Sequence, residues 1–122
     1  MHELSIAMSL VDAACEESED LEEGSRIIAL HLRLGALAGV VKEALLFSFD
    51  LVAADTVIAG ARLLIEDVPV VVMCPTCNEE REIESIQRFR CPICGAPAPN
   101  VIRGRELQLF AMEIDDCVHT HS

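Results

Sequence analysis

The stretch CPTCNEEREIESIQRFRCPICG, residues 74–95, contains two C-x2-C motifs separated by thirteen residues. Two residues between cysteines allow one tight turn to present both sulfurs to the same ion, and two such turns complete a tetrahedral set of soft ligands. Proline follows the first cysteine of each pair, and Asn78 or Gly95 follows the second, where a positive φ lets backbone N–H groups reach the sulfurs. The stretch therefore predicts a metal site formed by Cys74, Cys77, Cys91 and Cys94.

Zinc is the metal that this spacing favours, and the alternatives are rubredoxin-like iron and two reversible disulfides. Electron transfer by iron needs no flanking α/β domain, and a reducing compartment disfavours stable disulfides. Four thiolates leave no open coordination position, so zinc here would be structural and not hydrolytic. The residues between the turns hold too little apolar surface to fold alone, which predicts that folding is coupled to metal binding.

The sequence on either side of this stretch indicates an α+β fold. Apolar residues at helical spacing predict one helix from Leu4 to Cys15, with Leu4, Ala7, Met8, Val11, Ala14 and Cys15 on the buried face. The same spacing predicts a second helix within residues 40–55, with Val41, Leu45, Phe49 and Val52 inward. Alternation in residues 27–35 predicts a half-buried strand with Ile28, Leu30, Leu32 and Leu34 on one face and His31 and Arg33 on the other.

Two further strands complete the expected sheet. Residues 61–68 form one candidate, and residues 104–115 form the last, with Leu107 and Leu109 on one face and Phe110, Met112 and Ile114 on the other, so that both faces are expected to be covered. The simplest arrangement is a small β-sheet flanked by two helices, made from residues 1–68 and 103–122. A four-cysteine, zinc-ribbon-like module, residues 69–102, is inserted into it.

Composition excludes several classes of function. Nine Lys and Arg against 21 Asp and Glu give a net charge of −12, which repels nucleic acids and anionic membranes. Acidic residues interrupt the N-terminal apolar pattern and no long uncharged run follows, so the chain is expected to be cytoplasmic without a membrane partner. The sequence contains no nucleophile and base pair, phosphate-binding glycine loop or open catalytic metal triad, and we expect no enzymatic activity.

The first three residues, Met-His-Glu, form a second candidate metal site. The α-amine of Met1, the next peptide nitrogen and the imidazole of His2 can close fused chelate rings around nickel(II) or copper(II), which favour square-planar nitrogen. Glu3 can add its carboxylate or its peptide nitrogen. Taken alone, however, a histidine at position two is most often an ordinary surface residue.

The remaining cysteines and histidines have simpler interpretations. Cys15 is expected to be buried on the first helix, and His31 to be an exposed or half-buried surface residue. The C-terminal residues CVHTHS place Cys117, His119 and His121 together, either as a frayed terminus or as an adventitious metal site.

The order of these motifs resembles the HypA/HybF family of hydrogenase nickel-incorporation proteins. The resemblance covers almost the whole chain, and its most specific signals are the MHE start, the paired cysteines and RGREL at residues 103–107. It implies two helices beside a small sheet with a protruding zinc module. It also implies nickel held by His2, with the neighbouring backbone of Met1 and with Glu3 as further candidates, and structural zinc held by the four cysteines.

The function implied by the resemblance is that of a nickel metallochaperone. It would deliver Ni(II) to the immature large subunit of nickel-iron hydrogenase together with a HypB-family GTPase, and some relatives also serve urease. Some relatives have a nickel-binding histidine after the second cysteine pair, but residues 96–100 read APAPN here. The fourth nickel ligand therefore stays open among a backbone nitrogen, Glu3, Glu43, water and a partner group. The alternative function is a zinc-ribbon protein-interaction module without nickel, and strand exchange in a homodimer is a further hypothesis.

Overall fold

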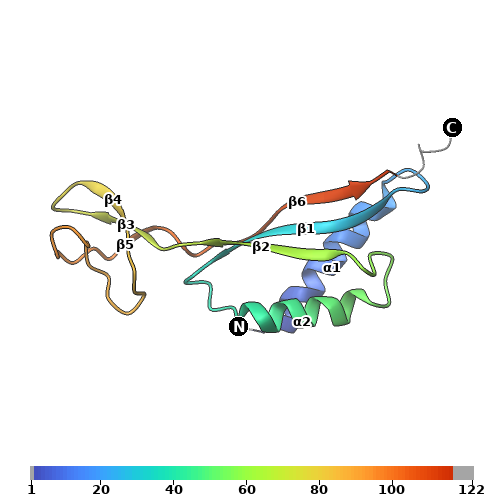
Figure 1. Cartoon of the computed structure of the whole chain (residues 1–122), viewed down its shortest axis with the longest axis horizontal. Helices are drawn as coiled ribbons and strands as arrows, with labels where there is room; N and C mark the ends of the chain where they lie inside the picture. The colour runs from blue at the N-terminus through green and yellow to red at the C-terminus, as the bar shows by residue number, and fades with distance from the viewer. Residues whose placement is uncertain (1, 117–122) are drawn as a thin grey trace. The chain divides into compact units, whose positions relative to one another are not determined.

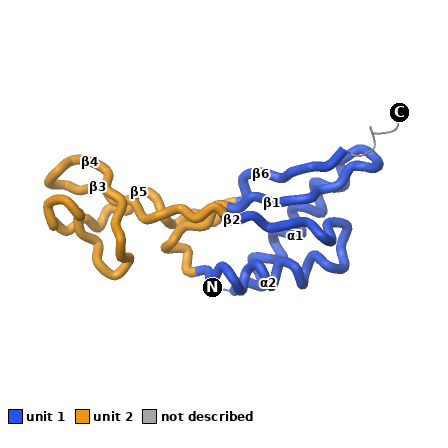
Figure 2. The backbone as a smooth tube through the Cα atoms, viewed as in Figure 1, with its two compact units in different colours: residues 1–32, 40–65, 109–122 blue, residues 33–39, 66–108 orange. Residues whose placement is uncertain are grey.

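The computed structural model describes residues 2–116 and divides into two compact units (Figures 1 and 2). Within the described residues, the first unit comprises residues 2–32, 40–65 and 109–116, and the second comprises Arg33–Gly39 and Glu66–Gln108. The second unit thus includes residues 33–39, 66–68 and 103–108, which the sequence analysis assigned to the other domain. The functional division into residues 1–68 plus 103–122 and residues 69–102 stays a prediction.

The elements confirm the α+β class. Two helices, α1 (Glu3–Glu19) and α2 (Lys42–Ala53), accompany a three-stranded sheet of order β2-β1-β6, built from β2 (Arg62–Val68), β1 (Arg26–Gly35) and β6 (Leu107–Asp115). The main core joins both helices to the sheet, and Phe49, Leu30, Leu32 and Leu45 are among its fully buried side chains. Among the described residues, no helix is long and apolar enough to cross a membrane.

Helix α1 confirms the predicted burial of Ala7, Val11 and Ala14 but differs at its other apolar positions. Its buried residues are Ala7, Leu10, Val11 and Ala14, spaced at i, i+3, i+4 and i+7. Leu4 and Met8, which were expected to be inward, are 50% and 51% exposed, and Cys15 is only half-buried against the core. Leu4, Met8 and Leu10 are all apolar, and packing against the rest of the core decides that Leu10 is the one covered.

Strand β1 follows the predicted alternation only in its second half. Leu30, Leu32 and Leu34 are buried while His31 and Arg33 are half-buried, as expected. Nearer its start, Ile27 and Ala29 are buried and Ile28 is half-buried, so the pattern shifts by one residue between Ala29 and Leu30. Helix α2 buries Leu45 and Phe49 as predicted and Ala53 in addition, whereas Val41 is exposed.

Strand β6 is not covered on both faces, contrary to the prediction. Phe110 and Ile114 are 38% and 46% exposed, and only Leu109 and Met112 pack against the main core as half-buried residues. Strand β6 lies at the edge of the three-stranded sheet and pairs with β1 alone, so its side chains have a neighbouring strand on one side only. The Phe110 ring instead lies 5.9 Å from the His31 ring.

The second unit contains its own three-stranded sheet. Strand β3 (Val71–Cys74) pairs antiparallel with both β4 (Glu79–Glu82) and β5 (Asn100–Arg103). Strand β4 was not predicted, because its sequence EERE has no apolar alternation. A small cluster of four buried residues supports this sheet, namely Val70, Val72, Ile83 and Ala98.

Two glycines, Gly35 and Gly104 of the RGREL segment, meet at a close backbone crossing within the second unit. Gly104 has φ +123, and its carbonyl oxygen accepts a hydrogen bond of 2.7 Å from the Leu37 amide. The Gly35 amide donates to the Glu106 carbonyl oxygen at 2.7 Å. A Cβ atom on Gly35 would lie 2.2 Å from the Gly104 oxygen, so the two chain segments meet at a point where no side chain fits.

Candidate metal centre

The four cysteines predicted from the two motifs converge in the second unit. Cys74 ends β3, Cys77 lies in the following turn, and Cys91 and Cys94 lie in a second turn. Hydrogen bonds from the Asn78 amide to the Cys74 carbonyl oxygen, 2.8 Å, and from the Gly95 amide to the Cys91 carbonyl oxygen, 2.9 Å, close the two turns. Asn78 has φ +58 and Gly95 φ +76, so the predicted positive φ values are confirmed.

The spacing of the sulfur atoms fits a tetrahedral ion. All four Sγ atoms lie within 4.8 Å of one another. The Cys74 and Cys94 sulfurs are 3.5 Å apart, and the Cys77 and Cys91 sulfurs are 4.0 Å apart. Tetrahedral zinc with Zn–S bonds of about 2.3 Å places its sulfurs about 3.8 Å apart. The donor set is therefore suited to zinc in both geometry and chemistry, and none of the four cysteines is joined in a disulfide.

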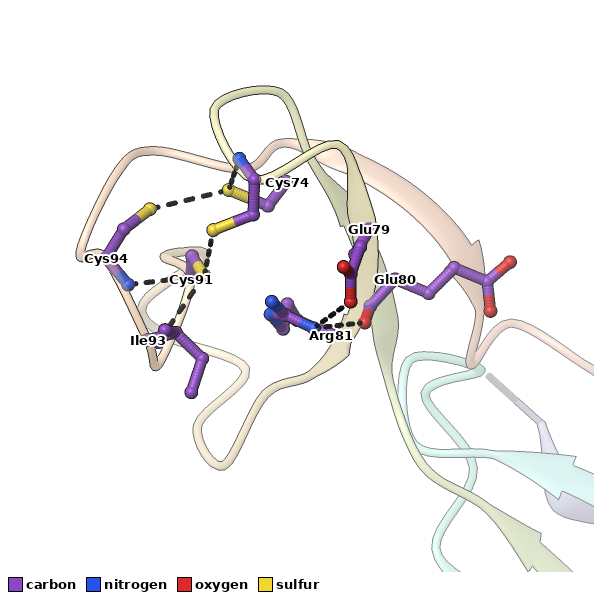
Figure 3. A network of polar contacts seen from close by, with 8 residues as sticks. Cys74, Glu79, Glu80, Arg81, Cys91, Ile93 and Cys94 are labelled. Carbon is purple, nitrogen blue, oxygen red and sulfur yellow. Dashed lines mark hydrogen bonds and ion pairs between the residues drawn. The ribbon is translucent and has the colours of Figure 1, made fainter.

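Backbone N–H groups point to two of the sulfurs, as the turn sequences predicted (Figure 3). The Cys77 amide donates to the Cys74 sulfur at 3.3 Å, and the Ile93 and Cys94 amides donate to the Cys91 sulfur at 3.4 and 3.5 Å. The Cys94 and Ile93 amides lower the pKa of the Cys91 thiol to about 6, because these donors stabilise its thiolate. Hydrogen bonds with the thiols of Cys94 and Cys74 raise the pKa of Cys77 to about 12.

The sequence analysis did not single out Arg81, which lies beside this cluster. Its guanidinium donates from Nη1 to the Glu79 carboxylate at 3.0 Å. The Glu79 carboxylate, followed by the nearby thiols of Cys91 and Cys77, raises the pKa of Arg81. Arg81 is the first basic residue after the first cysteine pair, and its nearest neighbours in the sequence are Glu79, Glu80 and Glu82. A single arginine among glutamates could have been noticed in the sequence. Only the strand register, however, shows that its side chain lies on the same face as Cys74.

The N-terminal candidate site lies in the first unit. Met1 is outside the described residues. His2 is exposed at the N-cap of α1, with extended backbone angles and no side-chain capping hydrogen bond. Glu3 is half-buried at the first position of α1, and Glu43 is exposed in the first turn of α2.

Glu3 connects the starting points of the two helices. Its Oε2 atom accepts a hydrogen bond of 2.8 Å from the amide of Val41, which is the N-cap residue of α2. This amide lowers the pKa of the Glu3 carboxyl, because it stabilises the carboxylate. A negative charge at a helix N-terminus is also favoured by the helix dipole. The sequence held no local signal for this contact, since 38 residues separate the partners.

The other candidate residues take structural positions. His31 Nε2 lies 2.6 Å from the Glu113 carboxylate on β6, which confirms a half-buried surface residue. Cys15 is half-buried on α1 and is not one of the four clustered cysteines. Cys117, His119 and His121 lie outside the described residues.

Comparison with known proteins agrees with these observations. The family model described as hydrogenase/urease nickel incorporation, metallochaperone, HypA matches residues 1–114. Hydrogenase maturation factor HypA of Chloroflexus aurantiacus is 53% identical over 117 residues, covering 93% of this chain and 98% of that protein. The corresponding factor of a Roseiflexus species is 48% identical over 116 residues, covering 95% and 94%.

Solved structures show the same fold. A solution structure of the Ni metallochaperone HypA from Helicobacter pylori matches with a TM-score of 0.59 at 24% identity, covering 93% of this chain and 97% of that chain. Another solution structure, of a HypA protein, matches with a TM-score of 0.67 at 24% identity, covering 95% and 98%. Proteins of this kind are maturation factors and not catalytic enzymes. With its family match, its relatives and its four-cysteine metal site, the chain belongs to the HypA family of nickel metallochaperones for hydrogenase maturation.

Proposed function

We propose that this protein carries Ni(II) as cargo in the cytoplasm and delivers it to the immature large subunit of nickel-iron hydrogenase. The observation that supports this most directly is the exposed His2 at the start of α1, within a chain of the HypA family. A metallochaperone must take up its ion and release it again. An exposed terminal site allows both, because incoming ligands from a partner can reach the ion without unfolding a core.

The proposed nickel ligands are the α-amine of Met1, the peptide nitrogen and imidazole of His2, and a group from Glu3. The first amides of an α-helix have no acceptor within the helix, so a metal can use the Glu3 peptide nitrogen without breaking a helical hydrogen bond. The Glu3 carboxylate already accepts the Val41 amide. We therefore favour the peptide nitrogen of Glu3 as the fourth ligand, with the carboxylate fixing the position of the chain terminus.

Nickel binding should depend on His2 and not on histidine content in general. Titration of Ni(II) into the protein with an unmodified N-terminus is expected to show one tight site with square-planar d–d bands. His2→Ala should abolish that site, because it removes one ligand and one chelate ring. His31→Ala is the matched control, since His31 is engaged with Glu113 on β6. Equal binding by all three proteins would instead favour a zinc-ribbon interaction module without nickel.

Glu3 should act through its hydrogen bond to α2. Glu3→Gln keeps an oxygen acceptor for the Val41 amide, whereas Glu3→Ala removes it. We expect Glu3→Ala to lower nickel affinity clearly more than Glu3→Gln, as measured by calorimetric titration of Ni(II). Glu16→Ala, which removes an exposed carboxylate from α1 outside every candidate site, serves as the control. If both Glu3 variants lost the same amount of nickel affinity, the charged carboxylate would be important as a direct nickel ligand and not as an acceptor for the Val41 amide.

The four cysteines are proposed to bind zinc in a structural role. Zinc bound there would cross-link the two turns that contain Cys74, Cys77, Cys91 and Cys94. The chain supplies the amides of Cys77, Ile93 and Cys94 as hydrogen-bond donors that stabilise the thiolates. Metal analysis of the purified protein should give one zinc per chain, and iron in its place would contradict the assignment.

A HypB-family GTPase is the proposed partner in delivery. Its addition should change either the nickel affinity or the rate at which nickel moves to a competing chelator. Identical values with and without the GTPase would count against this partnership. Homodimer formation is tested separately by light scattering of the zinc-loaded protein.

A further inference from the structure

The register of the second sheet places the Arg81 side chain on the metal-facing side. In the antiparallel pair, Val72 of β3 lies opposite Arg81 and Cys74 lies opposite Glu79. Residues directly opposite one another project to the same face, and neighbours along a strand project to opposite faces. Val72 and Cys74 are both fully buried. Arg81 and Glu79 therefore share a face with the ligand Cys74, whereas Glu80 projects to the other side, where it pairs with Arg103 at 2.6 Å.

Surrounding groups hold the Arg81 guanidinium against the cluster. Its Nη1 atom donates to the Glu79 carboxylate at 3.0 Å and to the Glu80 carbonyl oxygen at 3.3 Å, and the side chain is only 23% exposed. In Figure 3 the guanidinium lies between Glu79 and the loop that contains Cys91. After the larger effect of Glu79, the thiols of Cys91 and Cys77 are near enough to this guanidinium to raise the pKa of Arg81.

One N–H donor of this guanidinium, at Nε, is not satisfied by any acceptor in the described part of the protein. Arg81 Nε is buried and, within residues 2–116, has no hydrogen-bond partner. A buried donor without an acceptor is unfavourable, and such a group calls for an explanation. The nearby sulfurs change character when they bind a metal, because all four must then be thiolates. Metal-bound thiolates retain lone pairs that accept hydrogen bonds, so metal binding creates acceptors beside Arg81.

The net charge of the four-cysteine site with a bound divalent ion also favours a cation beside it. Four thiolates and one divalent ion carry a net charge of −2, in a part of the molecule where Cys74 and Cys91 are buried. A permanently charged guanidinium beside them offsets part of that charge. We propose that Arg81 is the outer-sphere cation of the four-cysteine metal centre, which hydrogen-bonds the sulfurs of Cys91 and Cys77 and slows loss of the metal. This inference rests on the proposed binding of a divalent ion by the four cysteines.

Zinc retention by the full-length protein tests the proposal. The proteins to compare are wild type, Arg81→Gln, Arg81→Lys and Arg103→Gln, each loaded with zinc and mixed with a chromophoric chelator. Arg103→Gln is the matched control, because it removes the same charge from β5, where Arg103 pairs with Glu80 and is 48% exposed. Loss of an outer-shell partner typically lowers metal affinity by about 10–100-fold. We expect Arg81→Gln to lower the zinc affinity, measured by competition with the chelator, by this factor. Arg81→Lys should lie between, because it keeps the charge but loses the planar set of donors.

A spectroscopic measurement on the wild-type protein supplies a second test. With cadmium-113 in the four-cysteine site, a scalar coupling between the metal and an Arg81 side-chain N–H is expected, since such couplings pass through N–H···S hydrogen bonds. Its absence would overturn the proposal even if Arg81→Gln failed to fold. Equal zinc retention by folded Arg81→Gln and Arg103→Gln would overturn it as well. If wild type bound neither zinc nor cadmium, the metal site itself would be wrong, whereas normal binding with no effect of Arg81 would refute this inference alone.

Discussion

Replacing Cys91 by serine is expected to unfold the second unit while the helices of the first unit remain folded. The second unit has a small apolar cluster of Val70, Val72, Ile83 and Ala98, whereas the first has the larger core around Phe49. In zinc-finger peptides, structural zinc contributes an apparent binding free energy of about 10–16 kcal/mol, which is also folding free energy. A serine hydroxyl is a poor substitute for a thiolate, so most of this contribution should be lost.

The measurement is a ¹H–¹⁵N spectrum together with far-UV circular dichroism. Resonances of residues 70–104 should collapse to unfolded positions, and the helical signal should persist. Cys15→Ser is the matched control, because it makes the same chemical change at a half-buried position of α1 outside the cluster. Treating wild type with a strong zinc chelator should reproduce the effect of Cys91→Ser. Retained dispersion after complete removal of zinc would show that the unit folds without metal.

Gly35→Ala should be the most damaging single substitution outside the cysteines. The new Cβ would lie 2.2 Å from the Gly104 carbonyl oxygen and 2.6 Å from the Glu106 nitrogen, and both are backbone atoms that cannot rotate away. The same crossing contains the hydrogen bonds from Gly35 to Glu106 and from Leu37 to Gly104. Overpacking usually costs about 1–3 kcal/mol, and we expect a loss above about 3 kcal/mol here because the backbone itself must move.

Urea denaturation midpoints of the zinc-loaded proteins measure this loss. Gly60→Ala is the informative control, since Gly60 has φ +88 but no atom within 4 Å of an added Cβ. That variant incurs only the left-handed backbone penalty of about 1–2 kcal/mol. If Gly35→Ala proved no more destabilising than Gly60→Ala, the close crossing of the two segments would be incorrect.

The sequence by itself determined the features that depend on neighbours along the chain. Two residues between cysteines and a turn-forming Asn78 or Gly95 specify each turn locally, and the positive φ values follow from that chemistry. The type and approximate extent of both helices and of β1 also follow from periodicity, because burial of one face repeats at the spacing of the element. For these features no contact with a distant segment is needed.

Only the tertiary structure decided which of several equivalent faces is used. Packing of helix α1 covers Leu10 and leaves the equally apolar Leu4 exposed, and Phe110 is exposed on the edge strand β6. The bond from Val41 to Glu3 joins residues 38 apart, and the register of β3 with β4 turns Arg81 toward the cysteines. Such contacts depend on strand pairing and on the docking of separate segments, and a one-residue change in register would reverse every face. Spacing along the chain therefore specifies the ligands, and long-range packing specifies what surrounds them.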